Sequence, residues 1–265
     1  TTEMISEMLS SQGKKVGTFK SPHLTSIRER IKLDGEKISE KEVSRQYRKL
    51  EKMEISLSFF EFLTVAAYNY FKEKKVDYAV MEVGMGGKLD ATNAVNPKLS
   101  IITNIEKEHT KYLGTTREEI AEEIAGITPE KGELVTSADL KQIKETAEER
   151  NTDIIRPHDL AKNGQEYVFR DQEFKIPIEG SYQRENLETA LKAVKKLEKT
   201  PENIESALSD LECPGRMEKV SKKPEIILDG AHNPAALNEL VKDLSEGFVC
   251  IFGCTETKKY EEMIE

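Results

Sequence analysis

Residues 76–90 read VDYAVMEVGMGGKLD, and this stretch decides the class of fold. Its first part, Val76–Val83, is mostly apolar and rich in valine, which predicts a strand buried on both faces. Glu82 lies at the end of this strand, and a glycine-rich turn follows at 84–87. Strands buried on both faces are typical of parallel sheets with helices packed on either side. The stretch therefore predicts an α/β protein.

Helical and strand-like segments alternate on both sides of this strand. Helices are expected at 1–12, 39–53, 58–74, 115–125, 184–197 and 201–210, and further strands at 15–19, 99–104, 133–137, 225–228 and 248–252. Ser39 with an acidic residue three positions later is a typical helix-capping signal. Because strands separated by helices pair in parallel through right-handed crossovers, we predict a mostly parallel sheet covered by helices.

Two interruptions of the alternation divide the chain. Residues 151–180 carry short strand-like pieces at 166–170 and 173–176 between turn residues, which predicts a small antiparallel insertion. Pro214 and Gly215 then interrupt the helical pattern, which places a domain boundary near 212–222. We expect a central domain at 1–213 and the start of a smaller α/β domain at 214–265.

Composition excludes several classes of function. The chain has 265 residues, with 40 basic and 49 acidic side chains and a net charge of −9, which argues against nucleic acid or an anionic membrane as partner. No apolar run approaches the roughly 18 residues of a membrane helix, and no signal peptide is evident. Three cysteines without a CxxC pair argue against a disulfide framework or a zinc site. We expect a cytoplasmic protein, with Cys250 packed in its core.

Polar residues and glycines gather where the expected strands end, which is where open parallel sheets bind ligands. Three of the four histidines, His23, His109 and His232, fall on these loops. The loops follow four different strands and comprise Lys20–His23, Gly84–Asp90, Thr103–Thr110 and Asp229–Pro234. Their convergence predicts a single site at one edge of the sheet.

Glu82 is the most informative residue, because a carboxylate at the end of an apolar strand needs a partner. Mg²⁺ is one such partner, since it takes one or two carboxylates together with water and phosphate oxygens. An ion pair with Lys88 or Lys20 is the alternative. The glycines at 84–87 match neither a dinucleotide fingerprint nor a phosphate-binding loop, and by themselves they predict a tight turn. Asp90 and the three residues after it could simply cap a turn.

Longer motifs indicate a family. They are KSPHL at 20–24, RERI at 28–31, FFEFLT at 59–64, EVGMGGKLDATN at 82–93, TNIEKEHTKYLG at 103–114, EEIAGI at 122–127, GSYQREN at 180–186, PGRMEKV at 214–220 and DGAHNP at 229–234. In number, order and spacing they resemble the folylpolyglutamate synthase and dihydrofolate synthase family, within the Mur ligase superfamily of ATP-dependent amide ligases. The resemblance implies a P-loop NTPase-like central domain. The family's phosphate-binding loop is expected just before Thr1, and a complete second domain is expected in the longer protein.

The resemblance also implies a reaction and a set of site residues. ATP phosphorylates the carboxylate of a folate or dihydropteroate, and the amine of L-glutamate displaces the phosphate. ATP and Mg²⁺ are the implied cofactors, with Glu82 and His109 as catalytic residues. The implied contacts are Ser21, Glu82 and His109 for the metal, Asn186 for adenine, Asp229 for ribose, Arg216 and His232 for the phosphates, and Phe60, Asp90 and Ala91 for the pteroate group. Because Asp229, Arg216 and His232 belong to the second domain and its linker, closure of the two domains would complete the site. A monomer is expected.

One residue departs from the family pattern. Ile124 stands where the family has a lysine that, in many members, is carbamylated and helps bind a second magnesium ion. The departure leaves open a Mur-type ligase that acts on another acid, such as a modified pterin or a cell-wall precursor. A catalytically silent paralogue that binds a nucleotide is the third hypothesis.

Overall fold

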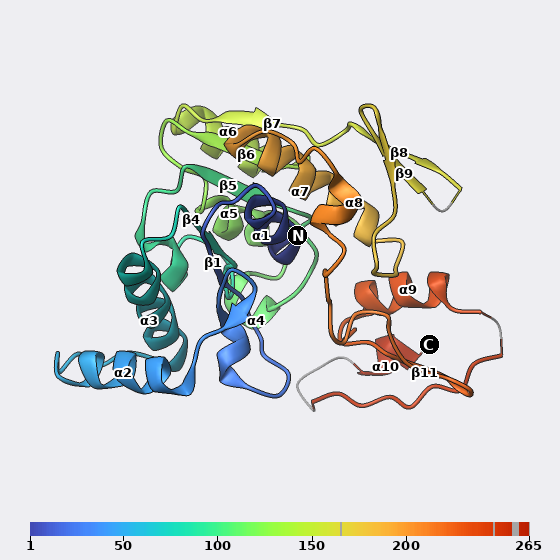
Figure 1. Ribbon diagram of the computed structural model, residues 1–265, viewed down its shortest axis with the longest axis horizontal. Helices are drawn as coiled ribbons and strands as arrows, with labels where there is room; N and C mark the ends of the chain where they lie inside the picture. The colour runs from blue at the N-terminus through green and yellow to red at the C-terminus, as the bar shows by residue number, and fades with distance from the viewer. Residues whose placement is uncertain (165, 246, 256–259, 265) are drawn as a thin grey trace.

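The computed structural model describes the whole chain except residues 165, 246, 256–259 and 265 (Figure 1). Its helices are α1 (Thr2–Ser10), α2 (Glu40–Glu51), α3 (Phe59–Lys74), α4 (Thr110–Leu113), α5 (Arg117–Ala125), α6 (Lys141–Glu149), α7 (Gln183–Leu197), α8 (Ile204–Ala207), α9 (Pro234–Asp243) and α10 (Tyr260–Ile264), with 3₁₀ turns η1 (Ile27–Arg30) and η2 (Ala91–Ala94). Its strands are β1 (Val16–Phe19), β2 (Ile31–Leu33), β3 (Glu36–Lys37), β4 (Tyr78–Met81), β5 (Leu99–Ile102), β6 (Glu133–Thr136), β7 (Asp153–Ile155), β8 (Leu160–Asn163), β9 (Glu166–Phe169), β10 (Gln172–Phe174), β11 (Glu218–Lys222) and β12 (Glu225–Leu228).

Parallel strands form the centre of the fold, as the sequence predicts. β1 pairs in parallel with β4, and β5, β6 and β7 form a second parallel ladder in that order. The antiparallel hairpin β2–β3 extends the first sheet beyond β1, and no sequence pattern predicted it. Two small antiparallel sheets, β8–β9–β10 and β11–β12, complete the architecture. The predicted α/β class is confirmed.

Strand β1 explains why helices cover both faces of the first sheet. Val16 packs in the apolar cluster of α1 and α7, and the Thr18 hydroxyl donates to Ser6 of α1 at 2.8 Å. Phe19, on the opposite face, packs with α2 and α3. Neighbouring Gly17 has no room for a side chain, because a Cβ atom there would lie 2.4 Å from the Phe71 ring. The alternation of a strand thus places one helical layer on each face.

Several predicted elements need correction. Asp153–Ile155 pairs in parallel with β6, so the antiparallel insertion comprises only β8 to β10. The helix expected at 201–210 is limited to Ile204–Ala207, and helix α6 was not predicted. Residues 248–252 form no strand, since no described strand pairs with them, and Ile251 is 99 % exposed. Cys250 is accordingly exposed and does not pack in the core.

The residues after Met217 form a part of different character, here called the C-terminal segment (218–264). It contains the hairpin β11–β12 and the helices α9 and α10, and it lies to one side of the central sheets (Figure 1). None of its residues whose burial is described is buried, whereas three apolar clusters fill the part before it. The domain boundary near 212–222 stays a prediction. No described helix combines the length and apolar character needed to cross a membrane.

Candidate functional site

A cleft of about 2350 Å³ runs along β4 and β5 and includes the loops after β1, β4 and β5, and residues of both the central part and the C-terminal segment line it. It brings together most of the residues predicted from the motifs, namely Ser21, Glu82, His109, Asn186, Arg216, Asp229 and His232. The predicted pteroate contacts Phe60, Asp90 and Ala91 are not among its lining residues. The strand-end loops therefore converge, and a loop of the C-terminal segment joins them.

Glu82 sits at the end of β4 because its backbone N–H donates to Phe19 O at 2.9 Å and continues the parallel ladder. Burial raises the pKa of its carboxyl group, and a long 3.4 Å hydrogen bond from Ser21 N together with the charge of Lys20 offsets this only in part. Within the described part of the chain, Glu82 forms no ion pair, since Lys20 binds Glu3 at 2.5 Å instead. The ion-pair alternative is therefore not what the structure shows, and the carboxylate has room for a cation.

His109 lies on the opposite loop, between β5 and α4. It adopts a left-handed backbone conformation with φ of 52° and exposes its side chain to the cleft. No group of three or more histidine, cysteine, aspartate or glutamate side chains is close enough to hold a metal ion among the residues described. An open Mg²⁺ site needs no such group, because water and phosphate oxygens complete it. Ser21, Glu82 and His109 line the same cleft, and their shared magnesium site stays a prediction.

Asp90 shapes the glycine-rich turn after Glu82. One carboxylate oxygen accepts hydrogen bonds from the Gly84 and Met85 N–H groups at 3.1 and 3.0 Å. The other oxygen accepts from the backbone and the hydroxyl of Thr92 at 2.9 and 2.6 Å. The structure thus gives Asp90 the turn-capping role that its sequence also allowed. Its predicted contact with pteroate stays a prediction.

Phe60 packs against the same turn. A Cβ atom on Gly84 would lie 2.3 Å from the Phe60 ring, so only glycine allows the ring to lie against the backbone there. The ring also contacts Phe19, with centroids 5.7 Å apart. Ala91, next to Asp90, begins the 3₁₀ turn η2. Phe60 thus supports the glycine-rich turn, and the predicted contacts of Phe60 and Ala91 with pteroate stay predictions.

The glycine-rich turn also contacts the end of α5, where Ile124 replaces the lysine of the family. Lys88 N donates to Glu123 O at 2.9 Å, and a Cβ atom on Gly87 would come within 2.7 Å of the Glu123 and Ile124 carbonyl oxygens. Ile124 packs beside the α5–α6 cluster and also lines the cleft. An apolar side chain, which cannot bind a metal ion, therefore lines the cleft at this position.

The C-terminal side of the cleft is built on Asp229. Its carboxylate oxygens accept hydrogen bonds from Met217 N at 2.8 Å and Ala231 N at 2.7 Å, which fold the turn before α9. The guanidinium group of Arg216 lies against this turn, since a Cβ atom on Gly230 would be 2.7 Å from its Nη1. Arg216 is exposed and forms no ion pair with the described residues. It can therefore bind a phosphate group.

His232 connects this turn with the metal side of the cleft. Its Nδ1 lies 2.8 Å from Gly230 O, and its Nε2 lies 2.8 Å from Oε1 of Glu108, which directly precedes His109. Each ring nitrogen therefore faces an oxygen that can accept a hydrogen bond. The motifs did not point to Glu108, although a carboxylate beside a strand-end histidine is a signal that could have drawn attention to it.

Asn186 lies on the first turns of α7, where its Nδ2 donates to Gln183 Oε1 at 3.2 Å and its Oδ1 accepts from the Thr1 hydroxyl at 2.9 Å. Tyr182, just before α7, also lines the cleft. Burial raises the pKa of its hydroxyl to about 12, and the neighbouring Asp229 adds to this rise.

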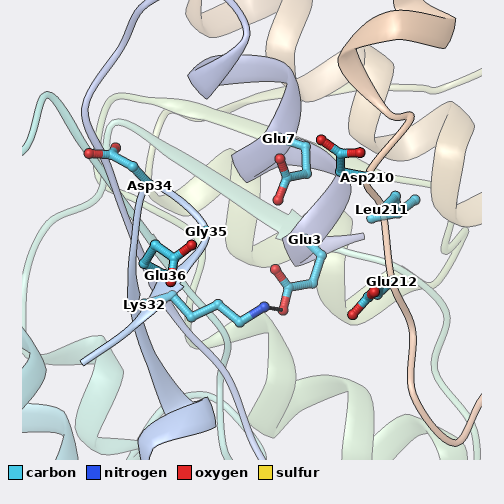
Figure 2. Close-up of a pocket in the computed structure, with 9 residues that line it drawn as sticks. All are labelled: Glu3, Glu7, Lys32, Asp34, Gly35, Glu36, Asp210, Leu211 and Glu212. Atoms are coloured by element: carbon cyan, nitrogen blue, oxygen red, sulfur yellow. Dashed lines mark hydrogen bonds and ion pairs between the residues drawn. The ribbon is translucent and has the colours of Figure 1, made fainter. Parts of the chain in front are cut away.

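A smaller pocket of about 270 Å³ adjoins the cleft beside α1 (Figure 2). Acidic side chains dominate it, and its lining is Glu3, Glu7, Lys32, Asp34, Gly35, Glu36, Asp210, Leu211 and Glu212. Burial alone would raise the pKa of Glu3, but ion pairs with Lys20 and Lys32 outweigh it and lower that pKa. Glu3 therefore holds both lysines, which leaves Glu82 without them.

Comparison with known proteins shows which class of protein this chain belongs to. Residues 1–194 match the Mur ligase middle domain, which agrees with the parallel strands and the cleft at their ends. The dihydrofolate synthase/folylpolyglutamate synthase of Bacillus subtilis is 32 % identical over 302 residues, which cover 100 % of this chain and 70 % of the relative. Across the curated relatives, the chain spans between 35 % and 70 % of their length.

Solved structures agree. The folylpolyglutamate synthase of Thermotoga maritima superposes with a TM-score of 0.84 at 33 % identity, over 99 % of this chain and 68 % of the other. A bifunctional folylpolyglutamate synthase/dihydrofolate synthase with Mn, AMPPNP and L-glutamate bound gives 0.80 at 31 % identity, over 91 % and 61 %. The chain belongs to the folylpolyglutamate synthase/dihydrofolate synthase family, and the family expected from the motifs is confirmed. The roles of individual residues stay predictions.

Proposed function

We propose that the complete protein is a monomeric, cytoplasmic, ATP-dependent ligase that adds L-glutamate to the carboxylate of a folate or dihydropteroate. One observation carries the proposal: a single cleft contains the Ser21, Glu82 and His109 side on one wall and the Arg216, Asp229 and His232 side on the other. The first wall offers oxygen and nitrogen ligands that form no competing ion pair with the described residues. The second offers the guanidinium group of Arg216, which is likewise unpaired within the described part of the chain. A nucleotide with its cation fits between two such walls.

Each wall has its own part in the reaction. Ser21, Glu82 and His109 would hold Mg²⁺, which neutralises phosphate charge when bound. Arg216 binds the phosphate oxygens and stabilises the negative charge that spreads over the transferred group. Asn186 and Asp229 orient the adenosine part, so that the γ-phosphate meets the acceptor carboxylate in line.

The bonds made and broken balance in two steps. The acceptor carboxylate oxygen attacks the γ-phosphorus, ADP leaves, and an acyl phosphate forms. The amine of glutamate then attacks the acyl carbon, phosphate leaves, and the amide forms as the amine loses a proton. Water must be kept from the acyl phosphate between these steps, which is the physical reason for a cleft whose two walls can close.

The substitution Glu82→Gln tests this proposal. It removes the metal-binding charge but keeps the size of the side chain, so phosphate release with Mg-ATP, glutamate and dihydropteroate or tetrahydrofolate should fall at least about 100-fold. The midpoint of thermal unfolding should not fall, because Glu82 contributes no ion pair to the fold. Glu106→Gln, in a neighbouring loop of the same cleft, is the matched control. Undiminished turnover by Glu82→Gln would remove Glu82 from the metal site.

A magnesium titration tests His109 separately. His109→Ala should raise the Mg²⁺ concentration needed for half-maximal activity, because one of three protein ligands is lost. An unchanged titration curve would remove His109 from the metal site without affecting the role of Glu82.

Ile124 favours a second candidate function, a Mur-type ligase that acts on a different acid. Its apolar side chain lines the cleft where the family has a lysine. Assays that offer a modified pterin acid or a cell-wall precursor beside folate and dihydropteroate separate the two candidates. ATP binding without turnover of any acceptor would instead identify a silent nucleotide-binding protein.

A further inference from the structure

We propose that Glu108 is a positioning residue that clasps the C-terminal segment onto the metal side of the cleft through His232. The proposal rests on the proposed ligase function. It assigns a role to a residue that the motifs left without one. The contact that carries it joins Oε1 of Glu108 to Nε2 of His232 at 2.8 Å, between residues 124 positions apart in the chain.

The position of Glu108 makes it a suitable anchor. It lies on the loop that leaves β5, and its backbone N–H donates to Glu106 O at 3.0 Å, which fixes a tight turn. His109 follows at once in the left-handed conformation. Because the two residues are adjacent, a group that binds Glu108 is held beside the imidazole proposed to bind the metal.

The other end of the clasp is tied to the nucleotide side. The His232 ring is held at Nδ1 by Gly230 O, at 2.8 Å, within the turn that Asp229 folds. Arg216 rests against the same Gly230. Because His232, Asp229 and Arg216 belong to one turn, the hydrogen bond from His232 to Glu108 positions the whole turn. Glu108 thereby sets the distance between the phosphate-binding wall and the metal-binding wall.

Two other polar contacts between described residues attach the C-terminal segment at a different place. Ser181 N donates to Asp243 at 2.7 Å, and Lys219 pairs with Glu179 at 2.9 Å. Both of these contacts attach the segment just before α7. The Glu108–His232 contact attaches it at the loop after β5. The contacts before α7 attach the C-terminal segment at one edge of the cleft only. The Glu108–His232 pair adds a contact on the other side of the cleft.

A double-substitution cycle tests the clasp on the complete protein. Glu108→Gln and His232→Gln should each lower kcat/KM for ATP, by about tenfold for Glu108→Gln, because the bond is charge-assisted but partly exposed to solvent. The double variant should be no worse than His232→Gln alone, because both changes break the same contact. Glu106→Gln, which removes an equal charge from the same loop, should keep wild-type kinetics.

A shape measurement gives a readout that does not depend on activity. Small-angle scattering should show a larger radius of gyration for Glu108→Gln than for the wild type and Glu106→Gln, with unchanged thermal unfolding. The clasp stands only if both results are found. If the reductions in kcat/KM of the two single variants multiply in the double variant, the clasp is overturned. An unchanged radius of gyration for Glu108→Gln overturns it as well. Wild-type protein without any ligation refutes the proposed function instead, and the scattering comparison then still decides the clasp.

Discussion

The central part of this protein and its C-terminal segment are built from the same kinds of elements but are held in different ways. In the central part, α7 buries Leu187, Leu191 and Val194 completely, each at 0 % exposure. In the C-terminal segment, α9 is also an amphipathic helix with a well-formed cap, yet none of its residues is buried. Apolar burial holds the first, and polar contacts such as Glu108–His232 hold the second.

Because of this difference, the two walls of the cleft differ in rigidity. Burial of apolar surface is strong and leaves one packed arrangement, so the wall with Ser21, Glu82 and His109 belongs to a rigid frame. Solvent-exposed polar contacts are individually weak and form or break readily. The wall with Arg216, Asp229 and His232 is therefore the part able to move. A reaction that must admit ATP and then exclude water needs both kinds of wall.

Truncating one large apolar side chain in each part tests whether apolar burial stabilises the central part alone. Leu191→Ala should lower the free energy of unfolding by about 2–5 kcal/mol, because it leaves a cavity in a filled core. Ile251→Ala should change it by less than about 0.5 kcal/mol, because Ile251 is 99 % exposed. Urea unfolding of both variants measures this. Similar losses in the two variants would show that the C-terminal segment is part of the same core.

Two aspartates, Asp90 and Asp229, each hold a turn by hydrogen bonds, one in the central part and one in the C-terminal segment. Replacing each of them tests the same difference between the two parts. Asp90→Asn weakens hydrogen bonds to Gly84, Met85 and Thr92 within the central part, so unfolding should cost about 1–3 kcal/mol less. Asp229→Asn disturbs a turn outside the packed core, so it should raise KM for ATP and leave the main unfolding transition in place. Differential scanning calorimetry and steady-state kinetics on the two variants check the contrast. A large fall in Tm for Asp229→Asn would contradict it.

The smallest expected effect concerns a polar contact inside the rigid frame. Hydrogen bonds from Leu24 N and from the Thr25 hydroxyl lower the pKa of Glu29 from 4.5 to about 2. A lowered pKa stabilises the fold above the unfolded value, and this contribution disappears as the pH falls from about 4.5 towards 2. The Tm difference between wild type and Glu29→Gln should thus be constant above pH 5 and shrink below it. It should stay within about 4 °C, because the bonds lie near the surface. A difference that grew on acidification would contradict the assignment.

Local sequence signals predicted much of the fold because they act over short distances. Ser39 caps α2 by accepting from Glu42 N, and the apolar runs at 76–83 and 99–104 became β4 and β5. Elements that exist only through a partner were missed or misplaced. The hairpin β2–β3 forms because it pairs with β1, whereas residues 248–252 have a strand-like composition but no described strand to pair with.

The candidate site divides in the same way. The motifs identified the residues that line the cleft, since polar groups at strand ends must meet when the strands are parallel. For Asp90 the sequence allowed both a pteroate contact and the turn-capping role that its carboxylate oxygens have in the structure, but it assigned no role to Glu108. Which partner a carboxylate finds depends on the chain path, and residue spacing does not record it.

The α/β class, the Mur ligase family and the loops that carry the chemistry follow from the amino-acid sequence, because periodicity and motifs are local properties. Which polar groups hold the fold together, and which stay available for a ligand, depends on how the chain folds. Glu3 binds Lys20 and Lys32, Glu82 forms no ion pair with any described side chain, and Glu108 contacts His232, 124 positions further along the chain. Hydrogen bonds and ion pairs act over a few ångströms, so the folded path of the chain, and not the order of its residues, selects their partners.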